Sequence, residues 1–232
     1  MDTDSLRVTW HGHSCFSVEH GGVHLLFDPY LTNNPVAKIR PETIRCTHVV
    51  CSHAHDDHSA DALAIARTNR APIFAPFELA EYFSAQGVEA VDLMPGGSVK
   101  TDFGEVKQVP AIHSASFEQP RGQNIAMGIA AGFLIKLGGK TVYFAGDTAV
   151  FSDMALIGHV GIDLAFLPIG DRYTMGIDDA VLALEYLCPA VTLPMHYNTH
   201  ALIRVDVGAF AKKAAAAGHL VKILAVEETA VV

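Results

Sequence analysis

Hydrophobic positions along the chain recur in two matching segments. The segment from Phe16 to Phe27 predicts a strand, a Gly-Gly turn and a second strand, and its positions match those 117 residues later, from Phe133 to Phe144. Two strand-forming runs around a two-glycine turn are typical of a β-hairpin. The match arises either by chance, because such hairpins are common, or from two related halves that each contribute a sheet. We favour two related halves.

The remainder of the chain alternates between the two kinds of element. Strands are predicted at 47–51, 72–75, near Val99, and at 105–109, 163–167, 190–193 and 220–226. Helices are predicted at 59–67, 78–86, 178–187 with Asp178 as its cap, and 205–217. No linker divides this series, so we expect one α/β domain over residues 1–232, with helices flanking sheets. Only the polar segment between Ser114 and Gly128 has no assignment, and loops of this length are usually functional or disordered.

Composition narrows the class of protein. Of 232 residues, 50% are hydrophobic and 18% are charged, which predicts a large folded core. No apolar run approaches the ~20 residues that span a bilayer, and the acidic, polar start does not resemble a signal peptide. The four cysteines have no CxxC spacing, which fits a reduced compartment. We therefore expect a cytoplasmic protein that does not bind membranes.

Charge and histidine content point toward a small-molecule site. The formal net charge of −9 disfavours binding to a nucleic acid backbone. The chain has 13 histidines but only 16 lysines and arginines together. Histidine is the commonest metal ligand in proteins and titrates near neutral pH. The excess indicates a metal or acid–base site without locating it.

The strongest local signal is the run from His53 to His58, with the sequence His-Ala-His-Asp-Asp-His. It directly follows a predicted buried strand and precedes a predicted helix, so its side chains lie on a tight turn at a sheet edge. Imidazole and carboxylate groups together suit Zn²⁺ and similar divalent metals. The alternative, a solvated histidine-rich turn, would leave a dense and poorly compensated polar cluster.

Further candidates follow other predicted strands. His113, Asp147 and His196 each come shortly after such a strand, and each alone is more often structural than functional. Two metals that share a bridging carboxylate need about seven protein ligands. The candidates number seven: His53, His55, Asp57, His58, His113, Asp147 and His196.

These motifs resemble the metallo-β-lactamase superfamily. The resemblance rests on H-x-H-x-D-H at His53 to His58, together with His113, Gly146-Asp147-Thr148 and His196, and it covers essentially the whole chain. It implies an αββα sandwich of two similar halves, in agreement with the repeat. The motifs around His13, Asp28, Asp171 and His196 further resemble uncharacterised bacterial and archaeal metal-dependent hydrolases, which are relatives of the ascorbate-6-phosphate lactonases.

The resemblance implies how the ligands divide. One metal would be held by His53, His55 and His113, and a second by Asp57, His58 and His196, with Asp147 bridging. Zinc is the expected metal, although ligands without cysteine also admit Mn, Fe or Ni. It also implies that relatives often self-associate, so a homo-oligomer is compatible with the sequence, which contains no feature that demands one.

The implied chemistry is hydrolysis of a small ester, lactone or phosphoester by a hydroxide held between two metals. Asp57 would orient the hydroxide as well as ligate. His13 is the best candidate for substrate contact or leaving-group protonation, with a purely structural role as its alternative. Asp28 is expected to fix the metal-binding turn by accepting backbone hydrogen bonds. The alternatives are a nuclease or phosphodiesterase of the same fold, a diiron redox protein, and a metal-bound sensor without activity.

Overall fold

Both predicted Gly-Gly hairpins form, and they have the same register. The computed structural model describes residues 5–118 and 122–232. The strands are β2 (Cys15–His20) with β3 (Val23–Phe27), and β11 (Ala131–Leu137) with β12 (Lys140–Phe144). Phe16 pairs with Phe27, and Phe133 pairs with Phe144. All four turn glycines have positive φ angles, a region of backbone conformation that favours glycine.

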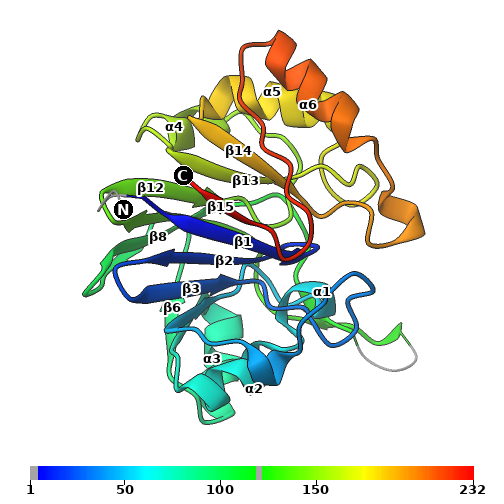
Figure 1. The fold of residues 1–232 in the computed structure, drawn as a ribbon. Helices are drawn as coiled ribbons and strands as arrows, with labels where there is room; N and C mark the ends of the chain where they lie inside the picture. Colours follow the sequence, from blue (N-terminus) through cyan, green and yellow to red (C-terminus); the bar gives the residue numbers. More distant parts are fainter. Residues whose placement is uncertain (1–4, 119–121) are drawn as a thin grey trace.

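Each hairpin lies inside a larger mixed sheet (Figure 1). The other strands of the two sheets are β1 (Arg7–Gly12), β4 (His48–Val50), β5 (Ile73–Pro76), β6 (Ala90–Leu93), β7 (Ser98–Lys100), β8 (Gly104–Pro110), β13 (Leu164–Pro168), β14 (Val191–Met195) and β15 (Thr229–Val231). The first sheet has the order β15-β1-β2-β3-β4-β5-β6 and the second β7-β8-β11-β12-β13-β14. In both sheets an antiparallel strand flanks the hairpin on one side and parallel strands follow on the other. This shared order supports two related halves.

The two sheets pack face to face, with helices on the outside (Figure 1). The helices are α1 (Asp56–Ser59), α2 (Ala62–Asn69), α3 (Phe77–Ala85), α4 (Met154–Gly158), α5 (Ile177–Leu187) and α6 (Val207–Ala216), with 3₁₀ turns at Pro41–Thr43 and Ala201–Ile203. Helices α2 and α3 cover the first sheet, and α4, α5 and α6 lie over the second. The predicted αββα sandwich is therefore confirmed. Among the described residues, no helix combines the length and apolarity that crossing a membrane requires.

Side chains alternate between the two faces of each strand, and those that point inward form a core between the sheets. Phe16 and Phe27 of the first sheet meet Phe144 and Phe166 of the second, with ring centroids 4.5 Å apart for Phe16 and Phe166 and 4.8 Å apart for Phe27 and Phe144. All four side chains are buried. Burial of a phenylalanine side chain stabilises the fold by about 1.5–3 kcal/mol. The packed sheets thus give a rigid support for the loops at their edges.

The segment between Ser114 and Gly128 contains a small hairpin of its own. Its strands β9 (Ser116–Phe117) and β10 (Ile125–Ala126) pair antiparallel. The ring of Phe117 packs against Tyr82 of α3, with centroids 4.6 Å apart. This contact anchors the described part of the segment to the helix, while its positions 119–121 lie outside the described residues.

Several sequence predictions differ from the structure. Residues 220–226 do not form a strand: Val221 makes one isolated bridge to Thr192, and Leu220 and Ile223 are exposed. The apolar run resembles a strand, but the chain leaves β14 after this bridge and adds its last strand, β15, to β1 instead. The N-cap of α5 is Gly176, so Asp178 lies in the first turn, where its charge favours the helix dipole.

Other boundaries also moved. The helix predicted at 59–67 corresponds to α2, which begins later, at Ala62, and ends at Asn69. Ser59 is instead the last residue of the separate short helix α1. The hydrophobic pattern predicts neither β6 nor α4.

Alanine at Gly21 and at Gly138 provides a matched test of the repeat. The two glycines occupy equivalent turn positions, with φ angles of 56° and 58°. Left-handed backbone costs an L-residue about 1–2 kcal/mol. A Cβ at Gly21 would meet no described atom within 4 Å, whereas one at Gly138 would lie 2.6 Å from the His20 ring. In urea denaturation we expect Gly21→Ala to lower the free energy of unfolding by about 1 kcal/mol and Gly138→Ala by at least as much. An unchanged free energy for both variants would contradict this.

Candidate metal centre

Polar side chains gather where strands of both sheets end at one edge of the sandwich. In the first sheet, His13 follows β1 and the run His53 to His58 follows β4. In the second sheet, His113 follows β8, Asp147 follows β12 and His196 follows β14. The structure brings together all eight predicted site residues: His13, His53, His55, Asp57, His58, His113, Asp147 and His196.

The first group at this edge consists of His53, His55 and His113. Each offers a ring nitrogen, and these nitrogens lie within 4.8 Å of one another. His53 Nε2 and His55 Nδ1 are 2.9 Å apart. Burial lowers the pKa of all three imidazoles, that of His53 well below its usual value. They are therefore neutral at pH 7, the form that binds a divalent metal.

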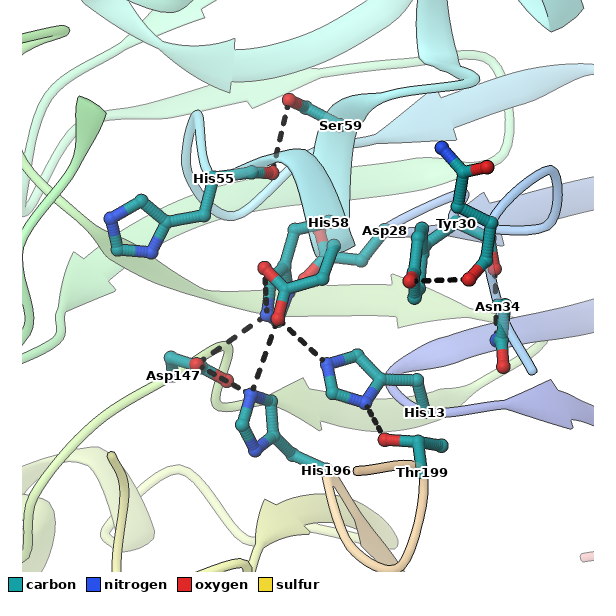
Figure 2. Close-up of polar contacts among 12 residues, drawn as sticks. His13, Asp28, Tyr30, Asn34, His55, His58, Ser59, Asp147, His196 and Thr199 are labelled. Carbon is teal, nitrogen blue, oxygen red and sulfur yellow. Dashed lines mark hydrogen bonds and ion pairs between the residues drawn. The ribbon is translucent and has the colours of Figure 1, made fainter. Parts of the chain in front are cut away.

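The second group consists of His13, Asp57, His58 and His196, whose ligand atoms also lie within 4.8 Å of one another. Asp57 Oδ2 is 3.2 Å from His13 Nε2 and 3.9 Å from His196 Nε2, and Asp57 Oδ1 is 3.8 Å from His58 Nε2. Figure 2 shows the rings of His13, His58 and His196 converging on one point. Burial, followed by the neighbouring His196, lowers the pKa of His13 to about 3, so its ring is neutral.

The Asp147 carboxylate faces both groups. Its Oδ2 lies 3.0 Å from His196 Nε2 and 3.4 Å from His58 Nε2 in the second group, and 3.6 Å from His113 Nε2 in the first. Burial alone would raise the pKa of Asp147, but the adjacent His196 and His58 outweigh burial and hold the pKa well below its usual value. An ionised carboxylate between two clusters of imidazoles has the geometry of a bridging ligand.

Asp28 orients this centre from the end of β3. Its Oδ1 accepts a hydrogen bond from Ser52 N at 2.7 Å, and its Oδ2 accepts one from Ser52 Oγ at 2.6 Å. The expectation that Asp28 accepts a backbone hydrogen bond is confirmed. Asp28 Oδ2 also lies 2.7 Å from His58 Nδ1. With Nδ1 engaged by the carboxylate, His58 Nε2 faces the second group, as is usual for metal-binding histidines.

Unpartnered polar atoms test whether a metal fits here. Among the described residues, His13 Nε2, His58 Nε2 and Asp147 Oδ1 are buried and have no hydrogen-bond partner. Each such atom costs about 1–3 kcal/mol when left unpaired. All three belong to the second group or to the Asp147 carboxylate that faces it. A divalent cation satisfies nitrogen and oxygen atoms of this kind, so the residues fit a metal.

The backbone at the centre is held in an unusual conformation. His13, Asp28 and His196, each directly after a strand, have φ angles of 57°, 39° and 55°. Such left-handed non-glycine residues cluster at functional sites. Beside them, Gly170 leaves room for His196: a Cβ there would lie 2.2 Å from the His196 carbonyl oxygen. The fold therefore maintains strain at the positions from which the ligands project.

Two supporting residues were not predicted from the sequence. Ser52 bonds to Asp28, and its Oγ lies 2.9 Å from His53 Nδ1. Thr199 Oγ1 lies 2.7 Å from His13 Nδ1 (Figure 2). Both hydroxyls stand within three residues of a predicted ligand, and Thr199 also belongs to the motif that begins at His196. In the long loop, Ser114 Oγ lies 3.5 Å from His55 Nε2, so the loop borders the first group.

Comparison with known proteins identifies the family. Residues 7–196 match the beta-lactamase superfamily domain. A UPF0173 metal-dependent hydrolase of Opitutus terrae is 50% identical to this chain, and the alignment covers 97% of this chain and 99% of the relative. The UPF0173 metal-dependent hydrolase YtkL of Bacillus subtilis is 43% identical, also over 97% of this chain and 99% of the relative. The structure resembles that of Igni18, a metallo hydrolase from Ignicoccus hospitalis, with a TM-score of 0.89 and 36% identity over 98% of each chain. The chain therefore belongs to the UPF0173 metal-dependent hydrolases of the beta-lactamase superfamily.

Proposed function

We propose that the chain uses two divalent metal ions to hydrolyse a small ester, lactone or phosphoester. The first ion is held by His53, His55 and His113, the second by Asp57, His58 and His196, and Asp147 is shared between them. The observation that carries this proposal is the Asp147 carboxylate, which lies within 3.6 Å of ring nitrogens in both groups. Zinc is the favoured metal, and Mn, Fe or Ni also suits these ligands.

When bound, two ions of this kind would lower the pKa of water to roughly 7, which would supply a nucleophile and stabilise the developing oxyanion. Residues of the chain would set the position of this nucleophile. Asp57 is one-third exposed, and the neighbouring His58 and His13 overcome the effect of burial and hold its pKa well below the usual value. As an ionised group partly open to solvent, Asp57 would accept a hydrogen bond from the attacking water and orient it.

The surroundings of the centre suit a small substrate. The segment between Ser114 and Gly128 borders His55, and we assign substrate selection to it. The net charge of −9 favours a small molecule over a nucleic acid. We further infer a cytoplasmic location, which the four unpaired cysteines support.

Metal analysis combined with a substrate panel tests this proposal. Purified protein, loaded with Zn²⁺ or Mn²⁺ and dialysed, is expected to hold close to two ions per chain by mass spectrometry. It should hydrolyse at least one of a lactone, a carboxylic ester and a phosphodiester, lose that activity to a chelator and regain it with metal. Fewer than two tightly held ions would overturn the dinuclear centre. Two ions without turnover on any substrate would instead indicate a metal-bound sensor.

A further inference from the structure

We propose that His13 is a ligand of the second metal ion and that Thr199 sets the orientation of its ring. This inference rests on the dinuclear centre proposed above. The His13 side chain is 0% exposed, so its ring is closed off from bulk solvent. Burial therefore favours a role toward the metal over the substrate contact expected from the sequence.

The position of the ring supports a ligand. One ring nitrogen of His13 lies within 4.8 Å of ligand atoms from Asp57, His58 and His196, and Nε2 is the nitrogen that lies 3.2 Å from Asp57 Oδ2. The ring centroid of His13 is 4.2 Å from that of His196 and 5.4 Å from that of His58. Three imidazole nitrogens and a carboxylate oxygen thus surround one point, the arrangement of a coordination site.

The hydrogen bonds of His13 leave one nitrogen unused. Nδ1 lies 2.7 Å from Thr199 Oγ1. Nε2 lies 3.2 Å from Asp57 Oδ2, but among the described residues it has no aligned hydrogen-bond partner. When Nδ1–H donates to Thr199, the lone pair of Nε2 faces the second group. His58 has the same arrangement, with Nδ1 on Asp28 and Nε2 unpartnered. Metal-binding histidines almost always engage their second nitrogen in this way.

The backbone joins His13 to a residue already assigned as a ligand. The His13 carbonyl oxygen accepts hydrogen bonds from His196 N at 3.2 Å and from Trp10 Nε1 at 3.0 Å. Trp10 in turn stacks on Tyr197, with ring centroids 5.3 Å apart. His13 comes from the first sheet and His196 from the second, so these bonds hold the two rings in a fixed relation across the sandwich.

The consequence is an asymmetric pair of sites. The second ion would be held by five protein side chains, including Asp147, whereas the first would be held by four. A six-coordinate ion at the second site would then have fewer positions left for substrate than one at the first. The first site, bordered by the loop at Ser114, is accordingly the one that we expect to take the substrate oxygen.

The His13→Asn variant tests the assignment, because asparagine tolerates the left-handed backbone at this position while removing the imidazole. In titrations of metal-free protein with Co²⁺, we expect one of the two ions to bind at least about 100-fold more weakly, with a changed visible spectrum, and the other to bind as in wild type. X-ray absorption of the Co²⁺-loaded variant should count fewer histidines per metal. Thr199→Val should weaken the same ion by about 10-fold.

The control is His200→Asn, since the His200 ring lies 5.8 Å from that of His13 but its side chain is outside both ligand groups. It should bind both ions as wild type does. If His13→Asn keeps wild-type affinities, spectrum and histidine count, His13 is not a ligand, and the proposed function stands without it. A wild-type protein that holds fewer than two ions would overturn the dinuclear centre itself. Should His13→Asn fail to fold, Thr199→Val decides: if it binds both Co²⁺ ions with wild-type affinity, the assignment is contradicted.

Discussion

Replacement of His55 by alanine is expected to abolish hydrolysis. His55 belongs to the first group, and its Nδ1 lies 2.9 Å from His53 Nε2. Loss of one of the three imidazoles is expected to weaken binding of the proposed first ion. A bound metal supplies several kcal/mol of transition-state stabilisation. Because each 1.4 kcal/mol is about tenfold in rate, we expect a loss of at least about 1000-fold in kcat/KM. Steady-state assays on the substrate found in the panel measure it.

His55 is well suited to this test because its removal should leave the fold intact. Its side chain is only half-buried, and it stands at the N-terminus of α1 without capping it through its side chain. The matched control is His159→Ala, an exposed histidine that follows α4 and should retain full activity. A His55→Ala enzyme with wild-type kcat/KM and two bound ions would refute the assignment of the first group.

The Asp28→Ala variant is expected to show the largest loss of stability. The carboxylate is fully buried and lies within hydrogen-bond distance of Ser52 N, Ser52 Oγ and His58 Nδ1. Removal of one partner from a buried ion pair costs about 3–5 kcal/mol. Alanine at a φ of 39° adds about 1 kcal/mol of backbone strain. The melting temperature should therefore fall by on the order of 10 °C.

This measurement requires metal-free protein, because a bound ion adds its own stabilisation to the folded state. Two comparisons sharpen it. Asp28→Asn keeps the backbone conformation and part of the hydrogen bonding, so its loss should be smaller. Asp102→Ala removes an exposed aspartate and should change the melting temperature little. If the Asp28→Ala and Asp102→Ala variants have the same melting temperature, the buried pair of Asp28 and His58 does not stabilise the fold.

Much of the fold and the metal centre could be predicted because the signals are local. Two-glycine turns fix a hairpin within twelve residues, and the equal spacing of Phe16 and Phe133 from their partners matches the observed register. Seven of the eight site residues follow predicted strands: the run from His53 to His58 supplies four of them, and His113, Asp147 and His196 follow three other strands. The likeness to lactonases, the number and identity of the metals, and the oligomeric state stay predictions.

What the sequence did not predict depends on distant contacts. The run 220–226 has the pattern of a strand. Whether it pairs depends on β14 and β1, whose edges are formed elsewhere in the chain. The role of His13 depends on Thr199, 186 residues later, and on burial by the second sheet. Neither local propensity nor spacing carries that information.

The pairing of β15 with β1 has a consequence for the order of events during synthesis. Arg7 and Val8 pair with Val231 and Ala230, so the first sheet gains its outer strand only after Val231 has left the ribosome. Until then, β1 presents an open edge, and unpaired edges are prone to join other chains. His196, from the second sheet, also emerges long after the His53 to His58 turn. A nascent chain is thus expected to pass through a stage in which it is exposed to aggregation and cannot yet hold the proposed second ion.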